Sequence, residues 1–186
     1  MTLLATILYE DQLAVEAKHF GLHELVLQCL ADRFPLRLDE LRAMFQASPR
    51  KGNTNVRKEC DDPRRTKLYR SRILVAVYDS DKVRDFIASS ASCKTSLRDA
   101  LRRTSPWGDN LTTVFLERNT ESVLAAIIEA QDRAKLPGKP EPQPRDKILL
   151  SAAWGPKSIR DRVLARVPSL QYLVEKLARE VTSYLA

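Results

Sequence analysis

Three short, uninterrupted apolar runs predict strands that are buried on both faces. They are Leu3–Tyr9, Ile73–Val77 and Leu111–Leu116. None alternates with polar residues, as a strand with one solvated face would, and this pattern is typical of a parallel sheet sandwiched between helices. Leu36–Leu38 is a candidate edge strand, and Tyr78 is expected to carry the chain out of the core.

Amphipathic stretches, with apolar residues at helical spacing, lie between and after these runs. They predict helices over residues 22–34, with a start upstream near Gln12, and over residues 38–45, 82–89, 93–103, 122–132, 145–153, 157–166 and 168–185. The order of runs and helices predicts an α/β fold with a small, mainly parallel sheet, covered by helices and closed by a helical C-terminal tail.

The length of the chain and one proline-rich segment indicate its domain organisation. A chain of 186 residues is long enough for one domain with a sizeable hydrophobic core and too short for two domains of typical size. Pro137–Pro144 holds four prolines and a glycine, which predicts a linker. We therefore expect an α/β domain over residues 1–136 and a tail over residues 145–186 that packs on the same domain.

The composition is that of a soluble globular protein, at 44% hydrophobic and 30% charged residues. No apolar stretch approaches the length that crosses a bilayer, and Met1–Tyr9 has neither a basic start nor a cleavage site. We therefore expect a cytoplasmic protein without a membrane partner.

The cysteines and histidines indicate neither a disulfide framework nor a zinc site. The three cysteines are scattered, with no short spacing between them. His19 and His23 are four apart, but Phe20 stands where a metalloprotease helix has its Glu. Both histidines are expected to be ordinary residues at a helix surface or boundary.

The formal net charge of +7 and the pI near 9.5 favour polyanionic partners. Nine Lys and Arg residues face three acidic ones between Ser48 and Arg72, where apolar residues nearly vanish. This composition predicts a surface excursion, with one helical turn around Val56–Cys60. The excursion is either a solvated loop or a phosphate-binding arm. The residues predicted to contact nucleic-acid phosphates are Arg50, Lys51, Arg57, Lys58, Arg64 and Arg65.

Carboxylates follow each of the three predicted strands. They are Glu10, Asp79 with Asp81, and Glu121 at the start of a helix. A parallel sheet brings such strand ends together along one edge, and hard oxygen ligands of this kind suit Mg²⁺ or Mn²⁺. The alternative is that Ser80 or Asp81 simply caps the next helix.

The segments that carry these carboxylates resemble the Toprim fold. They are ILYEDQ around Glu10, VAVYDSD around Asp79 and Asp81, and LERNTES around Glu121. The resemblance is to compact variants related to the overcoming-lysogenization-defect nucleases of bacterial defence and mobile elements. The closing stretch RDRVLARVPSLQYLVEKL also resembles the helical end of those proteins.

This resemblance implies a nuclease that hydrolyses phosphodiester bonds in DNA or RNA with Mg²⁺ or Mn²⁺. It implies that Glu10, Asp79 and Asp81 are catalytic and bind the metal, with Glu10 as a candidate general acid or base. Glu121 would be a further metal ligand. A small nuclease of this kind could act with a larger protein partner in a multi-component system.

Two other interpretations remain open. A receiver domain also has an acidic pair after its first strand, here Glu10–Asp11, and an Asp after its third, here Asp79. The long excursion before Asp79 and the absence of a Lys after a fifth strand argue against it. The second alternative is a non-catalytic subunit that keeps a Toprim-like fold and binds nucleic acid or a protein partner through its basic face.

Overall fold

The computed structural model describes residues 3–10, 21–80, 94–116, 120–130 and 157–186. The strands are β1 (Leu3–Glu10), β2 (Phe45–Arg50), β3 (Ser71–Asp79) and β4 (Leu111–Leu116). The helices are α1 (Leu22–Ala31), α2 (Leu38–Met44), α3 (Asn53–Asp61), α4 (Pro63–Tyr69), α5 (Lys94–Thr104), the short 3₁₀ helix η2 (Gly108–Asn110), α6 (Thr120–Ala130), α8 (Lys157–Arg166) and α9 (Pro168–Leu185).

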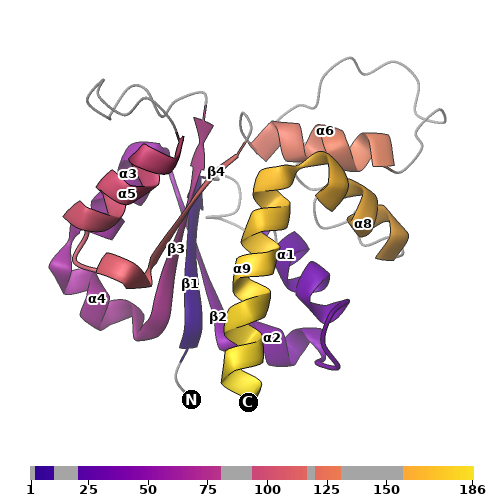
Figure 1. Cartoon of the computed structure of the whole chain (residues 1–186), viewed down its shortest axis with the longest axis horizontal. Helices are drawn as coiled ribbons and strands as arrows, with labels where there is room; N and C mark the ends of the chain where they lie inside the picture. The colour runs from indigo at the N-terminus through magenta and orange to yellow at the C-terminus, as the bar shows by residue number, and fades with distance from the viewer. Residues whose placement is uncertain (1–2, 11–20, 81–93, 117–119, 131–156) are drawn as a thin grey trace.

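The described strands form one all-parallel sheet in the order β2-β1-β3-β4, with helices on both faces (Figure 1). This architecture confirms the prediction of an α/β fold with helices covering a parallel sheet. The central strands β1 and β3 pair along most of their length, with Tyr9 opposite Val77. Both are almost completely buried, which explains their uninterrupted apolar composition.

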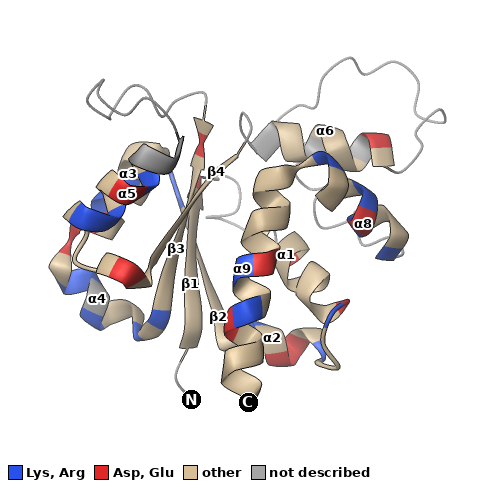
Figure 2. Cartoon of the chain, viewed as in Figure 1, with Lys and Arg blue, Asp and Glu red and all other residues tan. Residues whose placement is uncertain are grey.

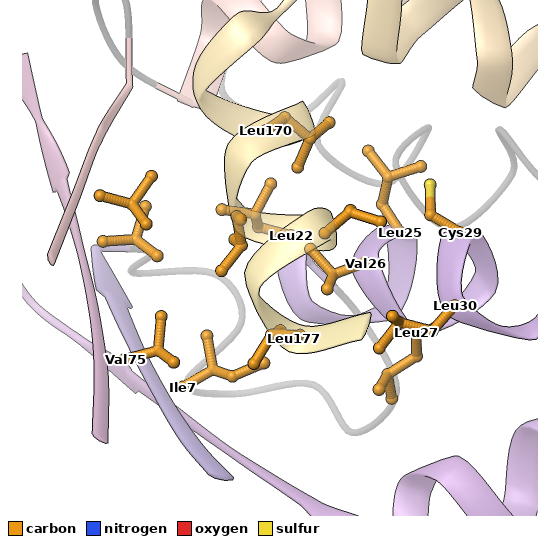
Figure 3. Packing of buried hydrophobic residues seen from close by; sticks show 14 of the residues in the cluster. Ile7, Leu22, Leu25, Val26, Leu27, Cys29, Leu30, Val75, Leu170 and Leu177 are labelled. Atoms are coloured by element: carbon orange, nitrogen blue, oxygen red, sulfur yellow. The ribbon is translucent and has the colours of Figure 1, made fainter. Parts of the chain in front are cut away.

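One face of the sheet is covered by α1, α2, α6, α8 and α9, which share a single hydrophobic core with it. Figure 3 shows Leu177 of α9 between Ile7 of the sheet and Val26 of α1. The C-terminal helices thus pack on the core of the sheet. Arg160 of α8, which is 9% exposed, also forms a two-pronged ion pair with Asp32 just after α1. This pair fastens α8 to the first helix.

The opposite face is covered by α3, α4 and α5, which bury a second apolar cluster. Tyr78 lies in this cluster at 1% exposure, stacked on Phe115 with 5.6 Å between ring centroids. Its hydroxyl contacts the Cys60 sulfur at 3.7 Å. The prediction that Tyr78 leaves the core was therefore wrong, because the pleat of β3 directs this side chain inward against α3.

The prediction of a surface excursion over residues 48–72 was also wrong. The segment contains the end of β2, the helices α3 and α4, and the first residues of β3. Val56 and Cys60 of α3 are completely buried, and Tyr69 of α4 is 6% exposed. Three apolar anchors are enough for these short helices because they lie against a sheet that is already apolar on that face.

The second strand is β2 rather than Leu36–Leu38, which leads into α2 and ends on its first residue. β2 is an edge strand with the sequence FQASPR, and its Pro49 is tolerated there.

The other described elements agree with the predicted helices and strands to within a few residues. The predicted helix start near Gln12, the helices over 82–89 and 145–153 and the linker over 137–144 lie outside the described residues. Among the helices that the structure does describe, none is both long and apolar enough to cross a membrane.

Candidate functional site

The carboxyl edge of the two central strands carries the first two predicted site residues. Glu10 is the last residue of β1 and Asp79 the last of β3, and these strands are direct neighbours. The chain leaves β1 for helix α1 on one face of the sheet and leaves β3 for α5 on the other. Ligand sites in parallel α/β sheets lie beyond the carboxyl ends of strands at such a point.

The pleat of the strands directs the two carboxylates to opposite faces. Glu10 comes two positions after Leu8, whose side chain lies in the cluster under α3 and α5, whereas Asp79 comes two positions after Val77, which lies on the α1 and α9 face. Residues two apart in a strand point to the same face. Glu10 is half-buried, and Asp79 is 5% exposed. A ligand shared by both carboxylates would therefore have to sit over the edge of the sheet, between the two strand ends.

Asn53 fixes the start of α3 against this edge. Its side-chain amide donates to the Asp79 carbonyl at 3.0 Å and its carbonyl accepts from the Asp79 N–H at 3.2 Å. Asn53 is 3% exposed, so both bonds are shielded from water. The preceding Gly52 has a φ of +85° and ψ of 151°, a conformation that only glycine adopts without strain. The N-terminus of α3 is thereby held beside the end of β3.

A polar chain that the sequence did not indicate runs beside the end of β1. The Tyr9 hydroxyl and His23 Nδ1 are 2.6 Å apart, and His23 Nε2 lies 3.6 Å from the Glu24 carboxylate. Glu24 is 1% exposed and receives two bonds from the Arg42 guanidinium, which raise the pKa of Arg42. A completely buried carboxylate of this kind needs such a partner. The network joins β1, α1 and α2, and His23 is a half-buried boundary residue, as predicted.

The four arginines predicted to bind phosphate all form ion pairs within the fold. Arg50 and Arg65 pair with Glu59 at 3.3 and 3.2 Å. Arg57 pairs with Asp61 at 2.6 Å and donates to the Thr104 hydroxyl at 2.9 Å. Arg64 binds Asp62 through two side-chain bonds and its own backbone N–H, and these bonds lower the pKa of that carboxyl.

The two predicted lysines differ from the arginines. Lys51 and Lys58 are exposed, and neither forms an ion pair with another described residue. Within the predicted set, the lysines are therefore the side chains that reach solvent without an ion-pair partner among the described residues.

Tyr69 completes the cluster around Glu59. Its pKa is raised by burial and by its bond to the Glu59 carboxylate.

The described part of the chain holds only part of the predicted metal set. Asp81 and the side chain of Glu121 lie outside it. Among the described residues, no group of three or more His, Cys, Asp or Glu is arranged to hold a metal ion. The oxygen-only ligand chemistry of Glu10 and Asp79 suits Mg²⁺ or Mn²⁺, which bind through one or two carboxylates and fill their remaining positions with water or substrate phosphate. It does not fit metals that prefer sulfur or nitrogen ligands.

Comparisons with protein-family models, with curated proteins and with solved structures found no match to this chain.

Proposed function

We propose that this chain is a Toprim-like, metal-dependent phosphodiester hydrolase that cuts DNA or RNA. The observation that carries the proposal is the position of Glu10 and Asp79 at the ends of adjacent central strands, whose next described helices, α1 and α5, lie on opposite faces of the sheet. The resemblance of the segments around Glu10, Asp79, Asp81 and Glu121 to Toprim motifs supports it, and suggests a place in a defence or mobile-element system with a larger protein partner.

In this proposal the carboxylates of Glu10 and Asp79 would hold Mg²⁺ or Mn²⁺ over the edge of the sheet, and Asp81 and Glu121 would complete the set. When bound, the ion would supply Lewis-acid stabilisation of the phosphate oxygens and lower the pKa of a water molecule. Glu10 is half-buried and could exchange a proton with that water. The side chain of Asn53 holds the backbone of Asp79, which keeps this carboxylate in place as substrate enters.

The basic residues of the 48–72 segment would hold the phosphate backbone beside this edge. Lys51 and Lys58 can do so directly, since their ammonium groups are exposed. Arg50, Arg57, Arg64 and Arg65 would contact phosphate only by exchanging or sharing their acidic partners Glu59, Asp61 and Asp62.

A second candidate function is a non-catalytic subunit that binds nucleic acid or a protein partner without metal. All four predicted arginines form ion pairs within the fold. This pairing favours the second candidate, because it gives these arginines a structural role that requires no catalysis. The opposite pleat directions of Glu10 and Asp79 favour it as well. The two candidates differ in one respect: only the hydrolase needs the carboxylates of Glu10 and Asp79 for its activity in the folded protein.

The test is cleavage of supercoiled plasmid, linear duplex and single-stranded RNA with Mg²⁺ or Mn²⁺, for the wild type and for Glu10→Gln and Asp79→Asn. Both substitutions keep side-chain size and remove the charge. Each should lower cleavage more than about 100-fold, because losing even a residue that only orients a metal ligand costs about 10 to 100-fold. Glu129→Gln, at an exposed position of α6, is the matched control and should keep full activity. Full activity in the two site variants would refute the proposal.

A further inference from the structure

The two helical layers differ sharply in charge. The layer of α3, α4, α5 and η2, taken over residues 51–70 and 94–110, holds eleven Lys and Arg against five Asp and Glu, a net charge of +6. The helices of the other face, taken over residues 21–44, 120–130 and 157–186, hold nine of each, a net charge of zero. Figure 2 shows Lys and Arg along all three helices of the first layer. Between the helical layers that the structure describes, the excess of positive charge thus lies on one face of the sheet.

Eight of these eleven cations fall into two groups by their contacts. Arg57, Arg64 and Arg65 are held by acidic residues of α3 and its C-terminal end. Arg57 also reaches Thr104 at the end of α5, so it braces these two helices together. The second group is exposed and forms no ion pair with any residue that the structure describes. Its members are Lys51, Lys58, Lys67, Arg70 and Arg103.

The same layer offers almost no other surface chemistry. The aromatic residues of this layer, Tyr69 at the end of α4 and Trp107 just before η2, are 6% and 7% exposed, so neither presents a ring on which an unpaired base could stack. Single-strand binding proteins rely on such stacking. Leu68 is the exposed large apolar residue of the layer, whereas binding to a bilayer surface needs a continuous apolar helix face. The apolar faces of α3 and α5 are already buried against the sheet.

We propose that the α3–α4–α5 face binds the phosphate backbone of double-stranded nucleic acid, through the exposed cations Lys51, Lys58, Lys67, Arg70 and Arg103. A surface of cations without stacking rings recognises a regular line of phosphates and not bases. Arg57 and Arg65 shape the face by linking its helices, and Arg64 binds the N-cap of α4, Asp62. The inference rests on the proposed function for the class of polymer, and it adds α4 and α5 to the contact surface and selects the duplex form.

The face begins at the candidate site. Asn53 pins the N-terminus of α3 to the end of β3, and α4 leads into the start of β3 at the opposite end of the sheet. The helix α5, with 11 residues, is about 16 Å long and so spans about five base pairs at 3.4 Å each. A duplex that lies along these helices would pass from the end of the sheet where β3 begins to the end that carries Glu10 and Asp79.

The test is binding of a fluorescent 24-base-pair DNA duplex in EDTA, so that hydrolysis plays no part. The triple variant Lys58→Glu, Lys67→Glu, Arg103→Glu removes three phosphate contacts. Each contact contributes about 0.9 to the slope of log affinity against log salt, so the slope should fall by about 2.7 and the affinity at 0.1 M salt by about 100-fold or more. The matched control reverses three exposed arginines of the other layer, with the same change in net charge. It is Arg33→Glu, Arg162→Glu, Arg179→Glu, and it should bind nearly as the wild type does.

Three results would overturn the inference. One is an equal loss of duplex affinity in both triple variants, which would show that only the net charge of the protein matters and not the position of the cations. Another is an unchanged salt slope in the first variant. The third is tighter binding of a single strand with the same number of phosphates, or of anionic vesicles, than of the duplex. The slope of log affinity against log salt can also be measured for the wild type alone. A slope below about 2 would contradict five phosphate contacts, which predict about 4.5.

Failure of the proposed function would look different. Asp79→Asn should bind duplex in EDTA like the wild type, whether or not the chain cleaves. Duplex binding that depends on the α3–α4–α5 face, without cleavage by the wild type, would refute the hydrolase and leave this inference standing. Cleavage by the wild type that the triple variant Lys58→Glu, Lys67→Glu, Arg103→Glu leaves unchanged would support the hydrolase and refute this inference.

Discussion

The bridge between Asn53 and Asp79 should be among the most important polar contacts of the fold. Asn53→Ala removes the two bonds, of 3.0 and 3.2 Å, that tie the start of α3 to the backbone of β3. Both residues are at most 5% exposed, so the Asp79 N–H and carbonyl would lose their partner in a place that water reaches poorly. An unsatisfied buried group costs about 1 to 3 kcal/mol, and the bridge involves one donor and one acceptor of the backbone.

We therefore expect Asn53→Ala to lower the free energy of unfolding by about 3 kcal/mol. For a domain of this size that corresponds to a fall in Tm of about 6 to 12 °C. Asn53→Asp keeps an acceptor for the Asp79 N–H but turns a carboxylate oxygen toward the Asp79 carbonyl, so it should destabilise at least as much. Urea unfolding followed by circular dichroism measures both.

Asn55→Ala is the matched control, two positions further along the same helix. Asn55 is exposed, and its side chain bonds only to the Lys51 carbonyl. Alanine favours helix more than asparagine does, so this variant should stay within about 0.5 kcal/mol of the wild type or exceed it. If Asn53→Ala were as stable as Asn55→Ala, the bridge would contribute nothing and α3 would be held by its apolar contacts alone.

The ion pair that fastens α8 gives a second prediction: Arg160→Met should cost about 3 kcal/mol, because it leaves the Asp32 carboxylate without its partner, and the double variant with Asp32→Leu should recover part of that loss in urea unfolding. The cysteines give a third. Burial raises the pKa of both Cys29 and Cys60 to about 12, so in a Cys93→Ser background neither thiol should react with a disulfide reagent at pH 8 until guanidinium unfolds the chain, and fast labelling of the folded protein would show that this burial is wrong. Because these folded pKa values exceed the ordinary value of 9.0, the stability they contribute is complete below pH 9 and is lost as pH rises toward 12.

The buried strands could be predicted because their environment leaves a clear pattern in the sequence. β1, β3 and β4 are apolar on both faces, which no solvated element imitates. β2 leaves no such pattern, because an edge strand needs few apolar residues and Phe45 is its only large one. Of α3, only one helical turn around Val56–Cys60 was predicted, because these two are its only apolar side chains and basic residues surround them.

The candidate site could be predicted only in part. The sequence indicated that Glu10 and Asp79 lie along the same edge of a parallel sheet, but not that their strands are neighbours, because the strand order leaves no signal of its own. The bridge from Asn53 to Asp79 joins residues 26 positions apart through side chain and backbone, and such a contact leaves no periodic signal. The ion pairs of Arg57, Arg64 and Arg65 were equally hidden, because the composition shows the excess of cations but not which of them find acids.

Binding of Mn²⁺, followed by calorimetry with the 24-base-pair duplex present, tests the metal-dependent hydrolase most directly. The wild type should show saturable binding, and the double variant Glu10→Gln, Asp79→Asn should lose it while keeping its melting temperature within a few degrees. Equal Mn²⁺ binding in both proteins would place any metal away from the strand ends. Absence of binding to the wild type with duplex present would contradict the hydrolase and favour the subunit that binds without metal.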